Sequence, residues 1–313
     1  MFTNTLFLFY IFDMSLSYLY NETYKVPINA LSPRVVNGWP ANLGDVPYQV
    51  AFKRSIRKPM NKYATFCGGV IIAPAKLLSA AHCFTDKPSL ADKMCGGTGH
   101  ASQKVLSHTY AVAGQLSNHA IYHFKDSPSD GQWRRLKKVR YPPKYNFPKL
   151  DIAIVFLMTP FVYDNYVNSI PYARKYVDYS GKCLVSGFGR ISNRYNSDKL
   201  LLAHLTVLPL RLCNKMHRKN MHLFVCTSSQ YTDVGKGDSG GPLVCSHTGD
   251  PNESSKGVLV GIVSGHAYHI GSFFTRVSSY YHYIERNKSS PAKMANVISV
   301  LLLNLIQWKV LLF

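Results

Sequence analysis

Short apolar runs of strand length, separated by turn residues, recur through most of this 313-residue chain. Four of them, residues 68–72, 152–157, 201–208 and 257–263, are rich in aliphatic and β-branched side chains. Strands of this length with turn signals between them are typical of an all-β sandwich or barrel. Residues 278–286 break the pattern and predict a closing amphipathic helix, with a serine at its start as the N-cap, either Ser278 or Ser279.

The two ends of the chain differ from this middle part. An apolar run near the first residue is followed by small residues at Ser15 and Ser17, which indicates a signal peptide over residues 1–17. The run lacks a basic n-region and a clean cleavage site, so an ordinary N-terminus is the alternative. Residues 288–313 end in an apolar tail that polar residues interrupt, a poor match to a spanning helix. A GPI-attachment signal, a weak membrane anchor and a simple extension all fit this tail.

Basic side chains are in large excess: 36 Lys and Arg against 16 Asp and Glu give a formal net charge of +20. Such an excess favours an anionic partner such as nucleic acid, an acidic glycan, a membrane surface or an acidic substrate. The basic run at residues 134–140 is a candidate site for a polyanionic glycan, and so is a cluster of Lys53, Arg54, Arg57 and Lys58. The alternative, which is commoner for such runs, is a solvated loop.

The motif GDSGGP at residues 237–242 carries the clearest chemistry. Glycines on both sides of a serine allow tight backbone geometry, expose the hydroxyl and direct backbone N–H groups toward one point. Upstream lie SAAHC at residues 79–83 and DIAI at residues 151–154. The order histidine, aspartate, serine and the three contexts together resemble the chymotrypsin-like (S1) serine proteases of the trypsin-like kind. The resemblance covers residues 35–287, which would form the peptidase domain.

This resemblance implies a catalytic triad of His82, Asp151 and Ser239. Ser239 would attack the scissile carbonyl, His82 would take its proton and pass it to the leaving amine, and Asp151 would orient the imidazole. The backbone N–H groups of Gly237 and Ser239 would form the oxyanion hole. The implied fold is all-β, two six-stranded antiparallel β-barrels with a C-terminal helix. The first barrel would run from about residue 35 to near 151, and the second from about 159 to 275.

Members of this family are made as zymogens, and the sequence around Arg34 resembles their activation site. Residues 18–34 would be the propeptide, removed by an activating protease. Cleavage after Arg34 would free the amino group of Val35 to pair with Asp238 and order the oxyanion loop. The alternative is a basic turn before the first strand.

The cysteines agree with the same family. The resemblance implies three disulfides: Cys67 with Cys83, Cys183 with Cys245, and Cys213 with Cys226. Cys95 is left over, either as a free thiol or paired with another chain. The bridge that usually braces the specificity pocket is missing at both ends, because Gly235 stands at one cysteine position and no cysteine follows Ser264. This paired loss resembles an insect-type subfamily.

The expected substrate-binding residues are Asp233, Ser264, His266 and Ser272. Asp233 lies six residues before the serine of the motif, where trypsin-like members have the pocket floor. A buried carboxylate there selects Lys or Arg at P1, because a neutral side chain would leave it unpaired; a surface-loop aspartate is the alternative. The wall reads Ser-Gly-His instead of the usual Ser-Trp-Gly, and Ser272 replaces a glycine. The resemblance therefore predicts a pocket that is narrow, plastic or closed without a partner.

Two functional hypotheses follow. The first is a secreted endopeptidase that hydrolyses peptide bonds after Arg or Lys. The second is a catalytically weak or inactive homologue that serves as an extracellular binding module. The intact triad favours the first, and the altered pocket wall keeps the second open. Nucleic acid is not an expected partner of a secreted protein. No cofactor or metal is expected, since His119 and His123 lack the further ligands of a zinc site.

Overall fold

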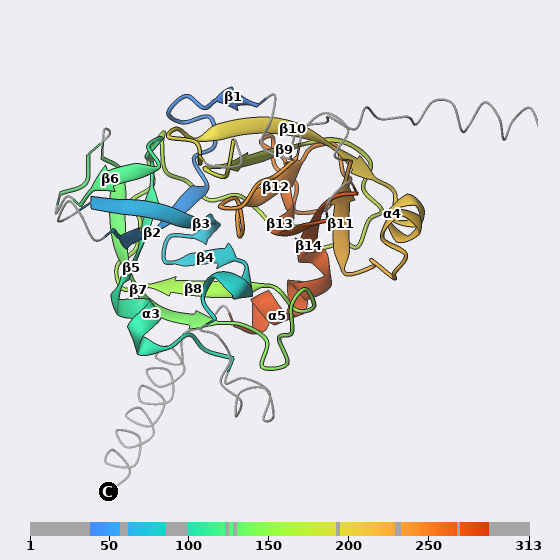
Figure 1. Ribbon diagram of the computed structural model, residues 1–313, viewed down its shortest axis with the longest axis horizontal. Coiled ribbons are helices and arrows are strands. Elements are labelled where there is room, and N and C mark those ends of the chain that lie inside the picture. Colours follow the sequence, from blue (N-terminus) through green and yellow to red (C-terminus); the bar gives the residue numbers. More distant parts are fainter. Residues whose placement is uncertain are drawn as a thin grey trace, which may run out of the picture. The chain divides into compact units, whose positions relative to one another are not determined.

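The computed structural model describes residues 38–56, 62–85, 99–122, 125–127, 130–191, 195–228, 233–267 and 270–287. Two antiparallel sheets dominate this part of the chain, and each closes into a barrel of six strands with one short strand added at its side. Figure 1 shows the two barrels side by side, the first in blue to green and the second in yellow to red. The expectation of two six-stranded β-barrels is therefore confirmed, and the sheets also carry two short strands that the sequence did not indicate.

The first barrel is closed by the pairing of its first two strands in the chain. In spatial order it contains β2 (Gln49–Ser55), β5 (Thr109–Ala113), β7 (Gln132–Arg140), β8 (Ala153–Leu157), β4 (Lys76–Ser79) and β3 (Lys62–Ala73). β3 pairs back onto β2, and the short β6 (His119–Ile121) pairs with β3 at its far end. The last strand ends at Leu157, so this barrel extends beyond the limit near residue 151 that the resemblance implied.

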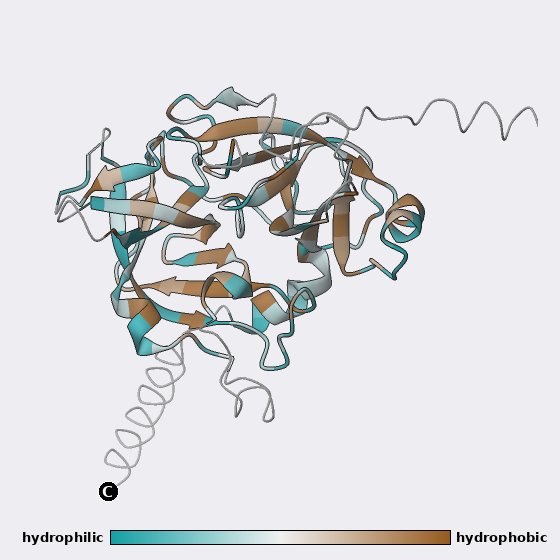
Figure 2. Cartoon of the chain, viewed as in Figure 1, coloured by the Kyte–Doolittle hydropathy of each residue, from teal (hydrophilic) through white to brown (hydrophobic). Residues whose placement is uncertain are grey.

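The second barrel contains β9 (Gly181–Gly187), β10 (Leu201–Leu208), β11 (Phe224–Thr227), β14 (Gly271–Arg276), β13 (Val258–Ala267) and β12 (Pro242–Cys245). β9 pairs with both β10 and β12, which closes the ring. Hydrophobic residues follow β8, β10 and β13 in Figure 2, because alternate side chains of each strand face a barrel interior. β1 (Trp39–Pro40) pairs with β10, so the first described strand belongs to the sheet of the second barrel and not to that of the first.

In the described part of the chain, helices are short and lie outside the barrels. They are α3 (Gln103–Ser107), α4 (Leu210–His217) and α5 (Tyr281–Arg286), with 3-10 turns η1 (Ala81–Cys83) and η2 (Val277–Tyr280). The C-terminal helix is present, and Ile284 anchors it in the core. The proposed caps are wrong: Ser278 and Ser279 lie inside η2, and the N-cap of α5 is Tyr280, which makes no side-chain capping bond.

Buried hydrogen bonds join the two barrels. The Gly68 N–H on β3 donates to the carbonyl of Ser239 at 2.7 Å. The Ser186 hydroxyl on β9 donates to Gln49 Oε1 on β2 at 2.6 Å. A hydrogen bond between buried partners is expensive to break, because each group would lose its partner away from water. The first of these bonds fixes the main chain of the motif serine against the opposite barrel.

Three disulfides link Cys67 to Cys83, Cys183 to Cys245 and Cys213 to Cys226, the same pairs that the family resemblance implies. The expected signal peptide, propeptide, Cys95 and apolar tail lie outside the described residues. Within the described ranges, no helix is long and apolar enough to cross a membrane.

Two basic residues of the candidate glycan sites are buried instead of exposed. Lys53 is fully buried, and its ammonium donates to the carbonyls of Ser117 and Asn118 at 2.7 and 2.6 Å. Burial lowers its pKa to about 7. Arg134 is also buried and makes paired bonds of 2.8 and 2.7 Å to Asp126. Both the glycan-binding and the solvated-loop interpretations are wrong for these two side chains.

Candidate active site

A histidine and a buried aspartate are held together at the junction of the barrels. His82 lies in η1 directly after β4, and Asp151 precedes β8, the partner of β4. His82 Nδ1 lies 2.8 Å from Asp151 Oδ2, and the His82 backbone N–H donates to Oδ1 at 3.0 Å. The carboxylate has no exposed surface, whereas the imidazole is 26% exposed. The carboxylate thus orients an imidazole that remains accessible on one side.

Two hydroxyls from the second barrel complete the surroundings of Asp151. The Ser264 hydroxyl on β13 donates to Oδ2 at 2.6 Å, and the Thr275 hydroxyl on β14 donates to the backbone carbonyl at 2.7 Å. Ser264 was expected among the substrate-binding residues, but its side chain positions the carboxylate. Sequence reasoning missed both contacts. A polar residue at the end of the apolar run of β13 was the available signal, because buried hydroxyls almost always have partners.

The segment around Ser239 passes close to His82. The Ser239 carbonyl accepts the Gly68 N–H and lies 3.8 Å from Sγ of Cys83, the residue after His82. Gly240 has φ of +79°, and a Cβ there would lie 2.2 Å from Ser79 Oγ. Only glycine fits this position, which explains the glycine after the serine in the motif.

The groups expected to bind an oxyanion have no competing partner. Among the described residues, the N–H groups of Gly237 and Ser239 donate no hydrogen bond. Ser239 is a partly exposed residue, and within the same part of the chain its hydroxyl makes no hydrogen bond, including none to His82. The two N–H groups are the expected donors to an oxyanion, and the hydroxyl is the expected nucleophile.

Asp238 is held by two backbone amides of the second half of the chain. It is fully buried and accepts the N–H groups of Gly189 at 2.7 Å and Gly235 at 2.8 Å. Burial raises its pKa to about 6, although the two backbone hydrogen bonds act in the opposite direction. Within the described part of the chain no cation contacts this carboxylate. Its proposed partner, the amino group of Val35, lies outside that part.

Asp233 is buried as well, at 2% exposure, so the surface-loop alternative is wrong. The Ser272 hydroxyl donates to its Oδ1. His266 Nδ1 lies 2.9 Å from its Oδ2, but the ring N–H does not point along the line that joins the two atoms. The pair is therefore a close contact and not an aligned hydrogen bond. His266 and Ser272 thus both contact Asp233, and their predicted narrowing of the pocket stays a prediction.

An aromatic ring lies beside Gly265, the glycine that replaces the usual tryptophan of the family. Gly265 on β13 pairs with Phe273 on β14. A Cβ at Gly265 would lie 2.4 Å from the Phe273 ring, so the ring occupies the space beside the glycine. The ring centroids of Phe273 and Phe147 lie 6.4 Å apart, and those of Phe147 and His82 lie 5.7 Å apart. An apolar row thus leads from the pocket wall to the imidazole.

Two closed antiparallel barrels with a buried aspartate–histidine pair at their junction define the chymotrypsin-like class of serine proteases. The family model described as Trypsin matches residues 35–284. The chain therefore belongs to the trypsin family. Curated relatives agree with this assignment. The chain is 28% identical over 273 residues to the venom peptide isomerase heavy chain of Agelenopsis aperta, which covers 81% of this chain and 99% of the relative.

Two further relatives are proteases by name. The chain is 25% identical to trypsin-3 of Salmo salar, over 77% of this chain and 85% of the relative. It is 28% identical to transmembrane protease serine 9 of Rattus norvegicus, over 74% of this chain but only 19% of that longer protein. These relatives support a serine protease at the level of the family. The insect-type subfamily is not tested by them.

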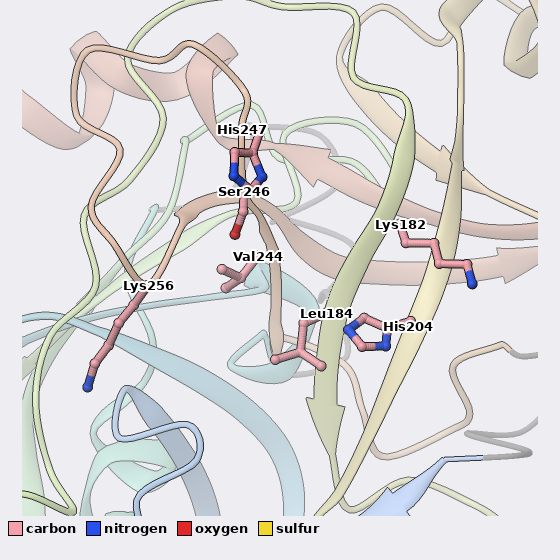
Figure 3. A pocket seen from close by; sticks show the side chains of 7 residues that line it. All are labelled: Lys182, Leu184, His204, Val244, Ser246, His247 and Lys256. Atoms are coloured by element: carbon pink, nitrogen blue, oxygen red, sulfur yellow. The ribbon is translucent and has the colours of Figure 1, made fainter.

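A separate pocket of about 350 Å³ lies on the second barrel, away from the histidine–aspartate pair. Figure 3 shows Lys182 and His204 on adjacent strands at one side of it, and Lys256 on a loop at the other. The remaining lining residues are Leu184, Val244, Ser246 and His247. None of these described lining residues is acidic.

Proposed function

We propose that this chain is a secreted serine endopeptidase, made as a zymogen and activated by cleavage after Arg34. The observation that carries the proposal is the buried Asp151 carboxylate, which fixes both the backbone and the ring of His82 beside the main chain of Ser239. An imidazole held by Nδ1 presents Nε2 as the base, as the family mechanism requires. His82 would take the proton of the Ser239 hydroxyl, and later give it to the leaving amine.

The same proposal assigns the oxyanion to the backbone of Gly237 and Ser239. Their N–H groups are without competing acceptors among the described residues, which supports this role. Loss of one such donor typically costs about 2.7–4 kcal/mol of barrier height. The tetrahedral intermediate would be stabilised there while His82 is protonated.

Activation would act through Asp238. A fully buried carboxylate without a cation is unfavourable, which is why its pKa is raised to about 6. Cleavage after Arg34 would supply the new amino group of Val35 as its partner and hold the oxyanion loop in place. Arg34→Gln should give a secreted protein that a trypsin-like activating protease leaves without activity. Activity of that uncleaved variant would contradict the zymogen proposal.

For substrate preference we propose Arg or Lys at P1, with Asp233 as the acceptor. Its burial supports this choice, since a buried carboxylate gains most from a cationic partner. The natural substrates would be proteins or peptides.

Labelling with a fluorophosphonate probe tests the catalytic part. After cleavage the wild-type protein should label, and Ser239→Ala and His82→Ala should not. Ser246→Ala and His247→Ala are matched controls, because both side chains are exposed in the separate pocket (Figure 3), and these variants should label like wild type. Absence of labelling in cleaved wild type would reject the endopeptidase and favour the inactive binding module.

We also propose a sulfated or carboxylated glycan as partner, now at the separate pocket. Lys182 and Lys256 are exposed at it, and the whole chain carries +20 charges, which supports binding of a polyanion. The double variant Lys182→Gln with Lys256→Gln should elute from a heparin column at a lower salt concentration than wild type. An unchanged elution position would reject this site.

A further inference from the structure

We infer that the His266 imidazole occupies the position beside the Asp233 carboxylate that a basic P1 side chain needs. Such a side chain must therefore displace the imidazole in order to bind. This inference rests on the proposed endopeptidase function and makes its pocket more specific. It assigns His266 as a specificity-determining residue that weakens selection of Arg and Lys without taking part in catalysis.

The first support is that Oδ1 of Asp233 is already hydrogen-bonded and that the His266 ring occupies the space beside Oδ2, which itself has no hydrogen bond among the described residues. Oδ1 accepts the Ser272 hydroxyl and the Val234 N–H, the latter at 2.9 Å. Oδ2 lies 2.9 Å from His266 Nδ1. A P1 cation that enters the pocket therefore meets a carboxylate whose polar contacts are supplied by the chain itself.

The strand register explains how these contacts arise. His266 on β13 and Ser272 on β14 are direct cross-strand partners, so their side chains extend from the same place on the sheet. A shift in register occurs just before them, between Val263 and Gly265. Such a bulge re-aims the side chains that follow it. Both residues thus reach the carboxylate from neighbouring strands.

The imidazole is held loosely enough to be displaced. Neither of its nitrogens has a hydrogen bond among the described residues, although both are buried. The ring is 23% exposed, so part of it already faces solvent. Its outward rotation would break one misaligned contact, and this rotation must occur before a P1 cation can reach Oδ2, because the ring nitrogen lies only 2.9 Å from that oxygen. A guanidinium or ammonium would then make charge-assisted bonds to Oδ2 that the ring does not make.

The consequence is a reduced preference for basic P1 residues. Binding of Arg or Lys must offset the loss of the His266 contact, whereas a small P1 side chain leaves it in place. The effect belongs to ground-state and transition-state binding alike, so it should change KM and not kcat.

The experiment compares cleaved wild type with His266→Gly and with Asp233→Asn in the His266→Gly background. Peptide substrates with Arg, Lys and Ala at P1 give kcat and KM separately, and benzamidine reports the affinity for a small aryl amidinium cation. Fluorophosphonate labelling gives the concentration of active sites in every sample. His247→Gly is the matched control, because His247 is exposed with φ of 59°, where glycine is favourable.

His266→Gly should lower KM for the Arg and Lys substrates and Kd for benzamidine by about 3- to 10-fold, the net value of one polar contact that the cation no longer has to displace. The Ala substrate should change less than twofold, and Asp233→Asn should abolish the gain. Full labelling with unchanged or weaker benzamidine binding in His266→Gly would overturn the inference. If cleaved wild type itself does not label, the proposed function fails instead. Should His266→Gly not fold, His266→Ala is the second variant: tighter benzamidine binding is the expected result, and unchanged binding would overturn the inference.

Discussion

The electrostatic environment of Asp238 makes a prediction that can be measured without any substrate. The carboxylate is fully buried, and burial raises its pKa from 3.8 to about 6 in the full-length chain. Asp238→Asn keeps the side-chain shape and removes the ionisation. The difference in free energy of unfolding between the two proteins therefore isolates this one group.

The sign of the effect follows from proton binding. Between pH 3.8 and about 6 the folded protein holds the Asp238 proton more tightly than the unfolded chain does, so folding stability falls as the pH rises through this range. One pKa unit corresponds to about 1.4 kcal/mol, so ionised Asp238 should cost the uncleaved protein about 3 kcal/mol above pH 6. Because the side chain has no exposed surface, solvent screening reduces this value little.

Urea unfolding of uncleaved wild type and Asp238→Asn, from pH 4 to pH 7.5, provides the measurement. The stability of wild type relative to the variant should decline by most of 3 kcal/mol over this range. In protein cleaved after Arg34 the decline should disappear, because the Val35 ammonium would stabilise the ionised form. A difference that does not depend on pH in the uncleaved protein would refute the reasoning.

Three further predictions concern the rest of the site and the core. Burial lowers the pKa of Lys53 to about 7, so above that pH the unfolded chain binds more protons than the folded protein does. The free energy of unfolding should therefore rise by about 2 kcal/mol from pH 7.5 to 9. Urea titrations of Lys53→Met should lack this rise. Gly240→Ala should lower stability by more than about 2 kcal/mol in the same assay, because φ is +79° and Ser79 Oγ lies 2.2 Å from the new Cβ; an unaltered midpoint would contradict the described packing. Ser264→Ala should reduce kcat/KM roughly 10- to 100-fold, because Asp151 loses a 2.6 Å charge-assisted hydrogen bond; unchanged turnover at full probe labelling would exclude this role.

The sequence predicted the parts of the fold that depend on local pattern. The run at residues 201–208 coincides with β10, because alternation and β-branched content are local properties. The place of β1 was not predictable in this way. Its two residues pair with β10, more than 150 positions later, and nothing in a short Trp-Pro segment indicates such a partner.

Side-chain contacts show the same division. The order of His82, Asp151 and Ser239 was readable from motifs, whereas the bond from Ser264 to Asp151 depends on how one barrel faces the other. The burial of Lys53 could not be predicted, because a basic cluster indicates an exposed segment unless the inward-facing side of the strand is known. The contact of His266 with Asp233 requires the strand register after a bulge, which composition does not give.

Each barrel supplies a hydrogen bond to a site residue of the other, so the site forms only when both barrels are folded. Barrel two supplies the hydroxyl that steadies Asp151, and barrel one supplies the amide that anchors the Ser239 backbone. Neither barrel holds the complete site, so a truncated or half-folded chain would not assemble it even with all of its motif residues intact. The chemistry of the site thus depends on the folding of both barrels, whatever the state of the N-terminal segment.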